Sequence, residues 1–238
     1  MNYNTIILSD LHLGSKASRR DDILNFIENN TCNTLILNGD IIDGWALKRG
    51  SKWKDKDTKI IRKILKLSEN NTNVIWIMGN HDDFLKNFLF FNTGNISIKN
   101  DMIYNGIDGR TYYVFHGDVL DVFSNKFSMI AKIGSIGYDF ALWLNRWYNL
   151  YRELVGLPYY SLSKKIKDSV KAAVSFVGDF EKRAVKLAKD NKCDVAICGH
   201  IHSPKLEIDY MNSGDWCENN TALVEHDNGK WEVISLYK

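Results

Sequence analysis

The chain lacks several features that would place a protein in a familiar class at once. Its four cysteines form no Cys-x-x-Cys pair, and neither a basic segment nor a long apolar segment stands before the first apolar run. We therefore expect no disulfide scaffold, no secretory signal and a reducing, cytoplasmic location. No apolar run approaches the ~18–20 residues that a membrane-spanning helix needs, so we expect any membrane contact to be peripheral.

A strong excess of one charge is also missing. The 31 basic and 29 acidic residues leave a formal net charge of +2, and this balance does not point to a nucleic-acid partner. Hydrophobic residues make up 45% of the 238 positions, which is enough for a sizeable core. The length fits one large α/β domain or a domain with an inserted sub-domain.

What the chain does contain is one construction repeated five times, a short apolar run followed at once by polar residues. The runs and the residues after them are Ile6–Leu8 with Asp10 and His12, Leu35–Leu37 with Asp40, Val74–Ile77 with Asn80, His81 and Asp82, Tyr113–Phe115 with His116, and Val195–Cys198 with His200 and His202. Open α/β sheets place ligands at the carboxyl ends of buried strands. We therefore expect these side chains to meet on one rim.

The apolar periodicity predicts an α/β fold, in which strands and helices alternate and the first strands pair in parallel. The predicted strands cover 5–10, 34–38, 74–77, 96–98, 102–104, 111–115, 194–198, 205–211, 221–226 and 231–236. The predicted helices cover 20–30, 57–69, 121–133, 136–154, 161–176 and 179–190. The last four form a helical block between two strands of one sheet, which is typical of a cap or lid. We thus predict a core, 1–120 with 193–238, and an inserted cap, 121–192.

Seven residues on the expected rim can bind metal through oxygen or imidazole nitrogen. They are Asp10, His12, Asp40, Asn80, His116, His200 and His202. The pairs Asp10-x-His12 and His200-x-His202 would each share one side of an extended segment. Any one of these fragments alone is more often a turn or a chance pairing, but their joint occurrence after separate strands argues against coincidence. The set is too large for one ion and suits two, with Mn²⁺ expected and Fe²⁺ or Zn²⁺ also compatible.

In order and type, these motifs resemble those of the calcineurin-like metallophosphoesterase superfamily. The matching fragments are Asp10-x-His12, Gly39-Asp40-x-x-Asp43, Gly79-Asn80-His81-Asp82, His116-Gly117-Asp118 and Gly199-His200-x-His202. The resemblance implies a metallophosphoesterase sandwich of two mixed sheets flanked by helices, with a two-metal centre on one edge. It also implies how the ligands divide, with Asp40 shared: Asp10, His12, Asp40 and His202 for one ion, and Asp40, Asn80, His116 and His200 for the other.

Two cations ~3.5–4 Å apart can share a water, lower its pKa and bind two phosphate oxygens during an in-line displacement. Hydroxide is then the nucleophile, so no Ser or Cys is needed. In the superfamily that the chain resembles, the His after Asn lies beside the leaving-group oxygen. His81 is therefore our candidate for the proton donor or phosphoryl stabiliser, and Asp43 is the candidate residue that orients it.

A narrower resemblance is to the UDP-2,3-diacylglucosamine pyrophosphatase branch of the superfamily. It is found in Asp43–Arg49, Gly214–Trp216 and Thr221–Glu225. Enzymes of that branch cleave UDP-2,3-diacylglucosamine to UMP and 2,3-diacylglucosamine 1-phosphate for lipid A biosynthesis. The resemblance implies the same hydrolase activity here. One departure bears on the substrate, because the best-studied subgroup has Arg where this chain has His81.

The predicted cap combines aromatic and basic residues. Six of the fourteen residues from Tyr138 to Tyr151 are aromatic, and residues 121–171 hold eight basic against four acidic residues. Such a surface suits an acylated anion or the inner face of the cytoplasmic membrane, although packing of cap on core would use the same aromatic residues. We expect substrate contacts at Trp45, Lys48 and Arg49 in the core and at Trp143, Arg146, Trp147 and Arg152 in the cap.

Three other functions stay open at this stage. A generic phosphodiesterase or phosphomonoesterase would use the same metal centre on another nucleotide or phospholipid. A nuclease would present a broad basic groove, and the basic excess here is small. A non-catalytic binding module would have lost some ligands, whereas all seven are present. The sequence does not decide the oligomeric state.

Overall fold

The computed structural model describes residues 1–89, 92–123 and 177–236. The chain divides into two compact units, Met1–Val119 with Ala184–Lys238, and Leu120–Arg183. Of the second unit, 120–123 and 177–183 are described. The predicted helices over 136–154 and 161–176 lie outside the described residues, as does 124–133, so the cap remains a prediction. In the described ranges, no helix is long and apolar enough to cross a membrane.

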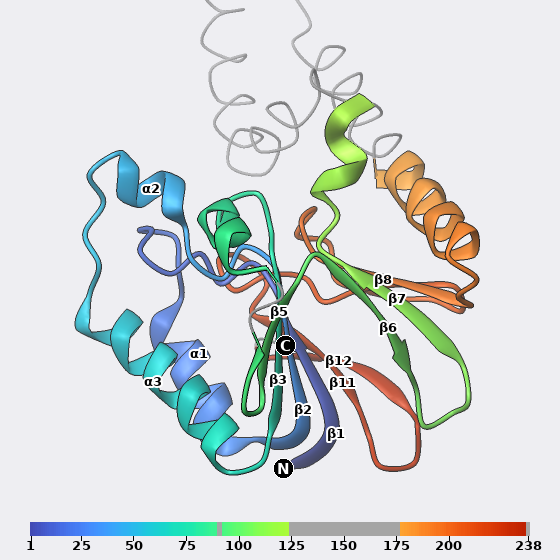
Figure 1. The fold of residues 1–238 in the computed structure, drawn as a ribbon, viewed down its shortest axis with the longest axis horizontal. Helices are drawn as coiled ribbons and strands as arrows, with labels where there is room; N and C mark the ends of the chain where they lie inside the picture. Colours follow the sequence, from blue (N-terminus) through green and yellow to red (C-terminus); the bar gives the residue numbers. More distant parts are fainter. Residues whose placement is uncertain (90–91, 124–176, 237–238) are drawn as a thin grey trace, which may run out of the picture. The chain divides into compact units, whose positions relative to one another are not determined.

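The larger unit contains two mixed β-sheets, as predicted (Figure 1). The first sheet has seven strands in the order β12-β11-β1-β2-β3-β5-β4. Its bounds are β1 Asn2–Leu8, β2 Thr31–Asn38, β3 Asn73–Ile77, β4 Asn92–Thr93, β5 Ile96–Lys99, β11 Thr221–Glu225 and β12 Trp231–Ser235. Strands β1, β2, β3 and β5 pair in parallel, whereas β4, β11 and β12 are antiparallel to their neighbours.

The second sheet has five strands in the order β6-β7-β8-β10-β9. Its bounds are β6 Asp101–Asn105, β7 Thr111–Phe115, β8 Val195–Cys198, β9 Lys205–Leu206 and β10 Tyr210–Asn212. Strands β7, β8 and β10 pair in parallel, and the antiparallel strands β6 and β9 form the edges. Each sheet therefore has a parallel centre whose carboxyl ends can contribute to a common rim.

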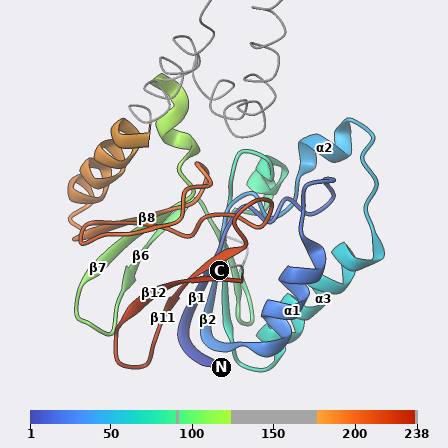
Figure 2. The ribbon, with the colours of Figure 1, turned by 180° about the vertical axis from the view of Figure 1, so that it is seen from behind.

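Two apolar cores hold these layers together. One fills the space between the first sheet and its helices α1, Arg20–Asn29, and α3, Asp55–Glu69, which lie side by side on one face of that sheet (Figures 1 and 2). Both helices turn apolar residues to the sheet at helical spacing, Ile23 and Ile27 from α1 and Ile60 and Ile64 from α3. The other core lies between the sheets, where Ile7 and Ile36 meet side chains of β7 and β8.

The structure corrects some of the predicted elements. The predicted strand over 205–211 is two strands, β9 and β10, separated by a turn. The first strand ends at Leu8 and not at residue 10, because the backbone of Asp10 turns into the left-handed region. Four short elements had not been predicted, because none is long enough to show a period: α2 Gly44–Lys48, η1 Asp83–Phe88, η2 Asp118–Phe123 and β4. A helix over 177–190 includes the predicted 179–190.

Candidate metal centre

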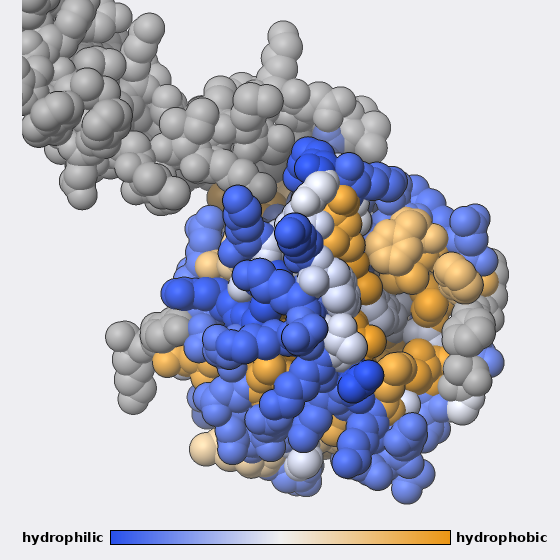
Figure 3. All heavy atoms as spheres, turned by 90° about the vertical axis from the view of Figure 1, so that its left-hand side faces the viewer, coloured by the Kyte–Doolittle hydropathy of each residue, from blue (hydrophilic) through white to orange (hydrophobic). Residues whose placement is uncertain are grey.

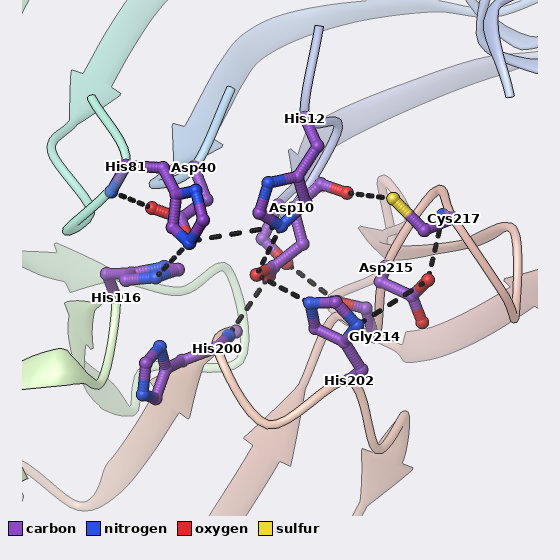
Figure 4. Close-up of polar contacts among 12 residues, drawn as sticks. Asp10, His12, Asp40, His81, His116, His200, His202, Gly214, Asp215 and Cys217 are labelled. Atoms are coloured by element: carbon purple, nitrogen blue, oxygen red, sulfur yellow. Dashed lines mark hydrogen bonds and ion pairs between the residues drawn. The ribbon is translucent and has the colours of Figure 1, made fainter. Parts of the chain in front are cut away.

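The loops after six parallel strands converge on one rim of the two sheets. Those after β1, β2 and β3 bring Asp10, His12, Asp40, Asp43, Asn80 and His81 from the first sheet, and those after β7, β8 and β10 bring His116, His200, His202 and Asp215 from the second. Figure 4 shows the side chains of Asp10, His12, Asp40, His81, His116 and His202 grouped together, with Asp215 and Cys217 on the far side of Asp10 and His202. The structure thus brings together residues from opposite ends of the chain.

The carboxylates and imidazoles form two main groups with metal-binding geometry. In each group the ligand atoms all lie within 4.8 Å of one another: Asp10, His12 and His202 in one, and Asp40, His116 and His200 in the other. The Oδ2 atom of Asp40 lies 3.4 Å from His116 Nε2 and 3.9 Å from His12 Nε2, so this carboxylate faces both groups. The assignment of these groups to two ions stays a prediction.

Two polar atoms at this centre fit a metal because they are buried without a hydrogen-bond partner. They are Asn80 Oδ1 and His116 Nε2. The opposite ring nitrogen, His116 Nδ1, lies 2.9 Å from the carbonyl oxygen of Asn38, and a carbonyl can only accept a hydrogen bond. The proton therefore sits on Nδ1, which leaves Nε2 as the atom that can bind a cation. Leaving such groups unpaired is costly, and an ion would remove the cost.

The backbone at this centre is strained at the ligands themselves. Five of the seven candidate ligand residues lie in the left-handed region, which few non-glycine residues adopt, although Asp and His do so more often than most. They are Asp10 at φ 55°, His12 at 45°, Asp40 at 54°, His200 at 68° and His202 at 51°. The sequence argument had placed Asp10-x-His12 and His200-x-His202 on extended segments. That geometry is wrong, although both pairs still reach the centre.

Glycines before the ligands are needed for close packing as well as for turning. A Cβ on Gly79 would lie 2.2 Å from Asp40 Oδ1, and one on Gly199 would lie 2.6 Å from Asp10 Oδ2. Gly39, Gly79 and Gly199 each precede a candidate ligand directly, and of these three only Gly39 has a positive φ, 80°. Gly79 is therefore not needed for a left-handed turn. The structure instead assigns it a steric role, because the loop after one strand packs on the carboxylate after another.

These loops are also joined by hydrogen bonds to the same carboxylates. The His200 amide donates to Asp10 Oδ2 at 3.0 Å, and the His81 amide donates to Asp40 Oδ1 at 2.8 Å. Each carboxylate therefore fixes a loop from another strand with one oxygen and turns the other oxygen to the imidazoles. This arrangement makes the ligand set a single rigid unit.

Burial and charge act in opposite directions on the central groups. Burial raises the pKa of Asp10, but contact with His202 and the nearby His116 and His12 rings hold that pKa well below its usual value. For Asp40, burial likewise opposes ionisation, and the His116 ring lowers the pKa below its ordinary range. Burial lowers the pKa of His116, yet Asp40 and Asp10 raise it well above normal. The centre thus keeps its carboxylates ionised and attracts positive charge.

His81 lies at the edge of this centre with a partner on each side. Its Nδ1 is 2.9 Å from Asp43 Oδ1, and its Nε2 is 3.9 Å from Asp40 Oδ2. Asp43 Oδ1 also accepts the Ala46 amide at 2.8 Å, which caps α2. Because Asp43 is 3.6 Å from His12 Nδ1, His12, Asp43 and His81 form a third group with metal-binding geometry.

Two acidic residues at the centre were missed as site residues by the sequence argument. Asp82 is fully buried and accepts the amides of Ile41 and Gly79 at 3.0 and 2.6 Å, so it joins the loops after β2 and β3. Burial and the nearby Asp40 raise the pKa of Asp82 to about 6. Asp215 lies behind His202. Asp82 had a signal, since it belongs to the same fragment as Asn80, but the role of Asp215 depends on contacts that no local pattern indicates.

The expected substrate contacts fall into two sets. Trp45, Lys48 and Arg49 are exposed on and after α2, and the Trp45 ring lies 4.2 Å from the His81 ring at a tilt of 33°. The cap residues Trp143, Arg146, Trp147 and Arg152 lie outside the described residues. Contacts with substrate therefore remain predictions at all seven positions.

Comparison with known proteins identifies the family. Residues 3–204 match the model of the calcineurin-like phosphoesterases, and the chain belongs to that family. It is also 22% identical over 211 residues to a UDP-2,3-diacylglucosamine hydrolase of Wigglesworthia glossinidia brevipalpis. The aligned region covers 86% of this chain and 82% of the relative. The predicted class is confirmed: the chain is a metal-dependent phosphoesterase, and the family uses divalent metals.

Solved structures of the protein Vps29 are similar to this chain in part. One, from Cryptosporidium parvum, has a TM-score of 0.42 at 10% identity and covers 97% of this chain and 95% of its own. Another, Vps29 of Entamoeba histolytica complexed with zinc, has a TM-score of 0.41 at 10% identity and covers 97% and 98%. At these scores the structures say nothing further about this chain.

Proposed function

We propose that this phosphoesterase hydrolyses the pyrophosphate of a lipid-linked nucleotide, with UDP-2,3-diacylglucosamine as the first substrate to test. The products would be UMP and 2,3-diacylglucosamine 1-phosphate, as in lipid A biosynthesis. The observation that carries the proposal is the convergence of seven metal-binding residues on one rim, beside an exposed apolar surface. The relative from Wigglesworthia, a hydrolase of that nucleotide by name, supports the choice of substrate.

In this proposal the centre holds two divalent ions. Asp10, His12 and His202 would hold one, Asn80, His116 and His200 would hold the other, and Asp40, which faces both groups, would contribute to both. When bound, such ions polarise the phosphoryl oxygens and generate hydroxide at neutral pH. Mn²⁺ is the first metal to test, followed by Fe²⁺ and Zn²⁺, because imidazole and carboxylate ligands suit all three.

His81 is proposed as the proton donor to the leaving group. The Asp43 carboxylate accepts from Nδ1–H, so Nε2 faces the centre and, in the imidazolium form of the ring, can donate its proton to an oxygen released there and leave His81 neutral. Trp45 packs against the same ring and restricts its motion. The chain thus fixes both the position and the orientation of His81.

The apolar surface beside His81 supports a substrate with an apolar part. Trp45 on α2 and Phe84 and Phe88 on η1 are 40%, 39% and 52% exposed. The ring of Phe84 lies against Gly44, so α2 and η1 are in contact there. Figure 3, which shows the face that carries α2, has hydrophobic residues gathered on one side of a mostly hydrophilic surface. Lys48 and Arg49 are proposed to meet the phosphates, and Trp143, Arg146, Trp147 and Arg152 remain predicted substrate contacts outside the described residues.

A substrate panel tests this proposal. Each buried acyl methylene contributes ~0.8 kcal/mol, so shortening the acyl chains of UDP-2,3-diacylglucosamine by several carbons should lower kcat/KM by orders of magnitude. Deacylated UDP-glucosamine and bis-p-nitrophenyl phosphate should be poor substrates. Equal kcat/KM on long-chain, short-chain and deacylated substrates would contradict the lipid assignment and favour the generic phosphodiesterase, which would still require metal.

A further inference from the structure

A turn in the carboxyl-terminal part of the chain, Asp215–Asn219, is organised around one buried carboxylate. Asp215 is 0% exposed. Its Oδ1 accepts the backbone amides of Cys217 and Glu218 at 2.8 and 2.6 Å, and its Oδ2 accepts Asn219 Nδ2 at 2.6 Å. The carboxylate therefore fixes the shape of the turn. The match to the family model ends at residue 204, so the turn lies beyond it.

The same turn contacts Asp10 and His202, two of the three residues of the group formed by Asp10, His12 and His202. The amide of Trp216 donates to the carbonyl of Asp10 at 3.1 Å. The Asn219 side chain donates to the carbonyl of His202 at 2.9 Å, so its amide joins Asp215 to the histidine backbone. Asp215 Oδ1 also lies 3.9 Å from His202 Nδ1 (Figure 4). The turn thus packs behind Asp10 and His202, on the side away from the centre.

The position of Asp215 has a direct chemical consequence for His202. The other ring nitrogen, Nε2, lies 3.2 Å from Asp10 Oδ1 and faces the centre. A negative charge beside Nδ1 favours the tautomer that carries its proton there, which leaves the Nε2 lone pair for a metal. Carboxylates that accept a hydrogen bond from the far side of a metal-binding histidine typically raise metal affinity ~10–100-fold, and here the contact is an ion pair at 3.9 Å.

We propose that Asp215 is a positioning residue for His202 and sets the affinity of the Asp10 group for its ion. The hydrogen bonds and the ion pair described above run from this turn to Asp10 and His202, so the ion of the Asp40 group should respond less. The inference rests on the proposed division of the ligands between two ions. It goes beyond that division, because it predicts that Asp215, which would bind neither ion, affects the affinity of one ion more than that of the other.

The test is metal binding by Asp215→Asn, measured by titrating the metal-free full-length protein with Zn²⁺ in competition with a chromophoric chelator. Asn keeps an oxygen that can accept the Cys217 and Glu218 amides but removes the charge. We expect two equivalents in the wild-type protein, and one of them weakened ~10–100-fold in the variant. The matched control is Glu218→Gln, which removes the same charge from an exposed side chain of the same turn and should change neither equivalent.

Histidine ¹⁵N NMR of the Zn²⁺ form supplies a second measurement. In Asp215→Asn the Nδ1–H signal of one zinc-bound imidazole should shift and exchange faster with solvent, because the group beside it has lost its charge. Unchanged affinity for both ions in the folded variant would overturn the inference, even if Asp215→Asn lowers the thermal stability. If that variant does not fold, Asn219→Ala should weaken the same equivalent to a smaller degree, and an unchanged titration would overturn the inference. A wild-type chain that binds fewer than two ions would instead overturn the division of ligands, and this inference with it.

Discussion

Both ends of the sheets contain buried carboxylates, and the two ends differ in the hydrogen-bond partners of these carboxylates and of the polar atoms around them. At the end opposite the rim, Glu225 is 0% exposed and all of its contacts come from neutral donors. Oε1 accepts the Ile107 amide at 2.8 Å, and Oε2 accepts Asn4 Nδ2 at 2.7 Å and the hydroxyl of Tyr104. This network joins β1, β6 and β11 and hence the two sheets.

At the rim, by contrast, some buried polar atoms lack a hydrogen-bond partner. Asn80 Oδ1 and His116 Nε2 have no hydrogen-bond partner, and Asp10 and Asp40 face a group of imidazoles. The ligand backbones are strained, whereas neither Asn4, Tyr104 nor Glu225 has a positive φ. A saturated network stabilises a fold, while an unsaturated and strained one is suited to bind something else. Trp231 Nε1, next to Glu225 in the sheet, is also buried without a partner, so what distinguishes the rim is unpaired atoms together with clustered carboxylates and imidazoles and positive φ angles.

Removing the shared carboxylate should have the largest effect. Asp40→Ala takes away the one side chain that faces both donor groups, so we expect hydrolysis to be abolished and metal content to fall below two ions per chain. The cores do not depend on Asp40, so circular dichroism should remain that of a folded protein. Hydrolysis at the wild-type rate in the presence of chelator would contradict the two-metal reading.

Replacing the candidate proton donor should have the next largest effect. His81→Ala should reduce kcat by ~10²–10⁴-fold on a substrate with a poor leaving group and leave both ions bound. The loss should shrink for p-nitrophenyl esters, whose leaving group needs no proton. The comparison between leaving groups also serves as the control. An equal loss of kcat on poor and good leaving groups would leave His81 only a positioning role.

A methyl group placed at the rim should disturb the centre without removing a ligand. In Gly79→Ala the new Cβ would meet Asp40 Oδ1 at 2.2 Å, and we expect a loss of about 1–3 kcal/mol in the free energy of unfolding together with weaker metal binding. Gly178→Ala is the matched control, because a Cβ there meets nothing within 4 Å and the residue lies in a helix. Denaturant titrations of both variants should differ; equal stability would argue against a close-packed centre.

The smallest functional effect is expected at the opposite end. Glu225→Gln turns an NH₂ group toward buried donors and should cost about 1–3 kcal/mol of stability. Metal uptake and kcat should not change at temperatures where the variant is folded. A loss of metal from the folded variant would show that the two ends are coupled and would break the comparison.

The sequence predicts the fold and the convergence of the candidate ligands on one rim, because both depend on where apolar runs end. The strand that ends before Asp40 and the one that ends before His116 are each visible as an apolar run followed by polar residues. Contacts between distant segments leave no such pattern. Asp82 contacts Ile41 across 41 positions, and Asn219 contacts His202 across 17.

Local conformation was equally hidden from the sequence. Extended spacing correctly paired Asp10 with His12 but for the wrong reason, because both residues have a positive φ. The rim loops are held in that conformation by tertiary contacts, such as the hydrogen bond from the His200 amide to Asp10. Tertiary contacts of this kind can override the intrinsic preference of a residue, and sequence periodicity does not report them.

Anomalous diffraction from crystals grown with Mn²⁺ would test the central claim most directly. The account predicts two peaks ~3.5–4 Å apart, one within Asp10, His12 and His202 and one within Asp40, Asn80, His116 and His200, with Asp40 touching both. A single peak, or a peak within the group of His12, Asp43 and His81, would contradict it.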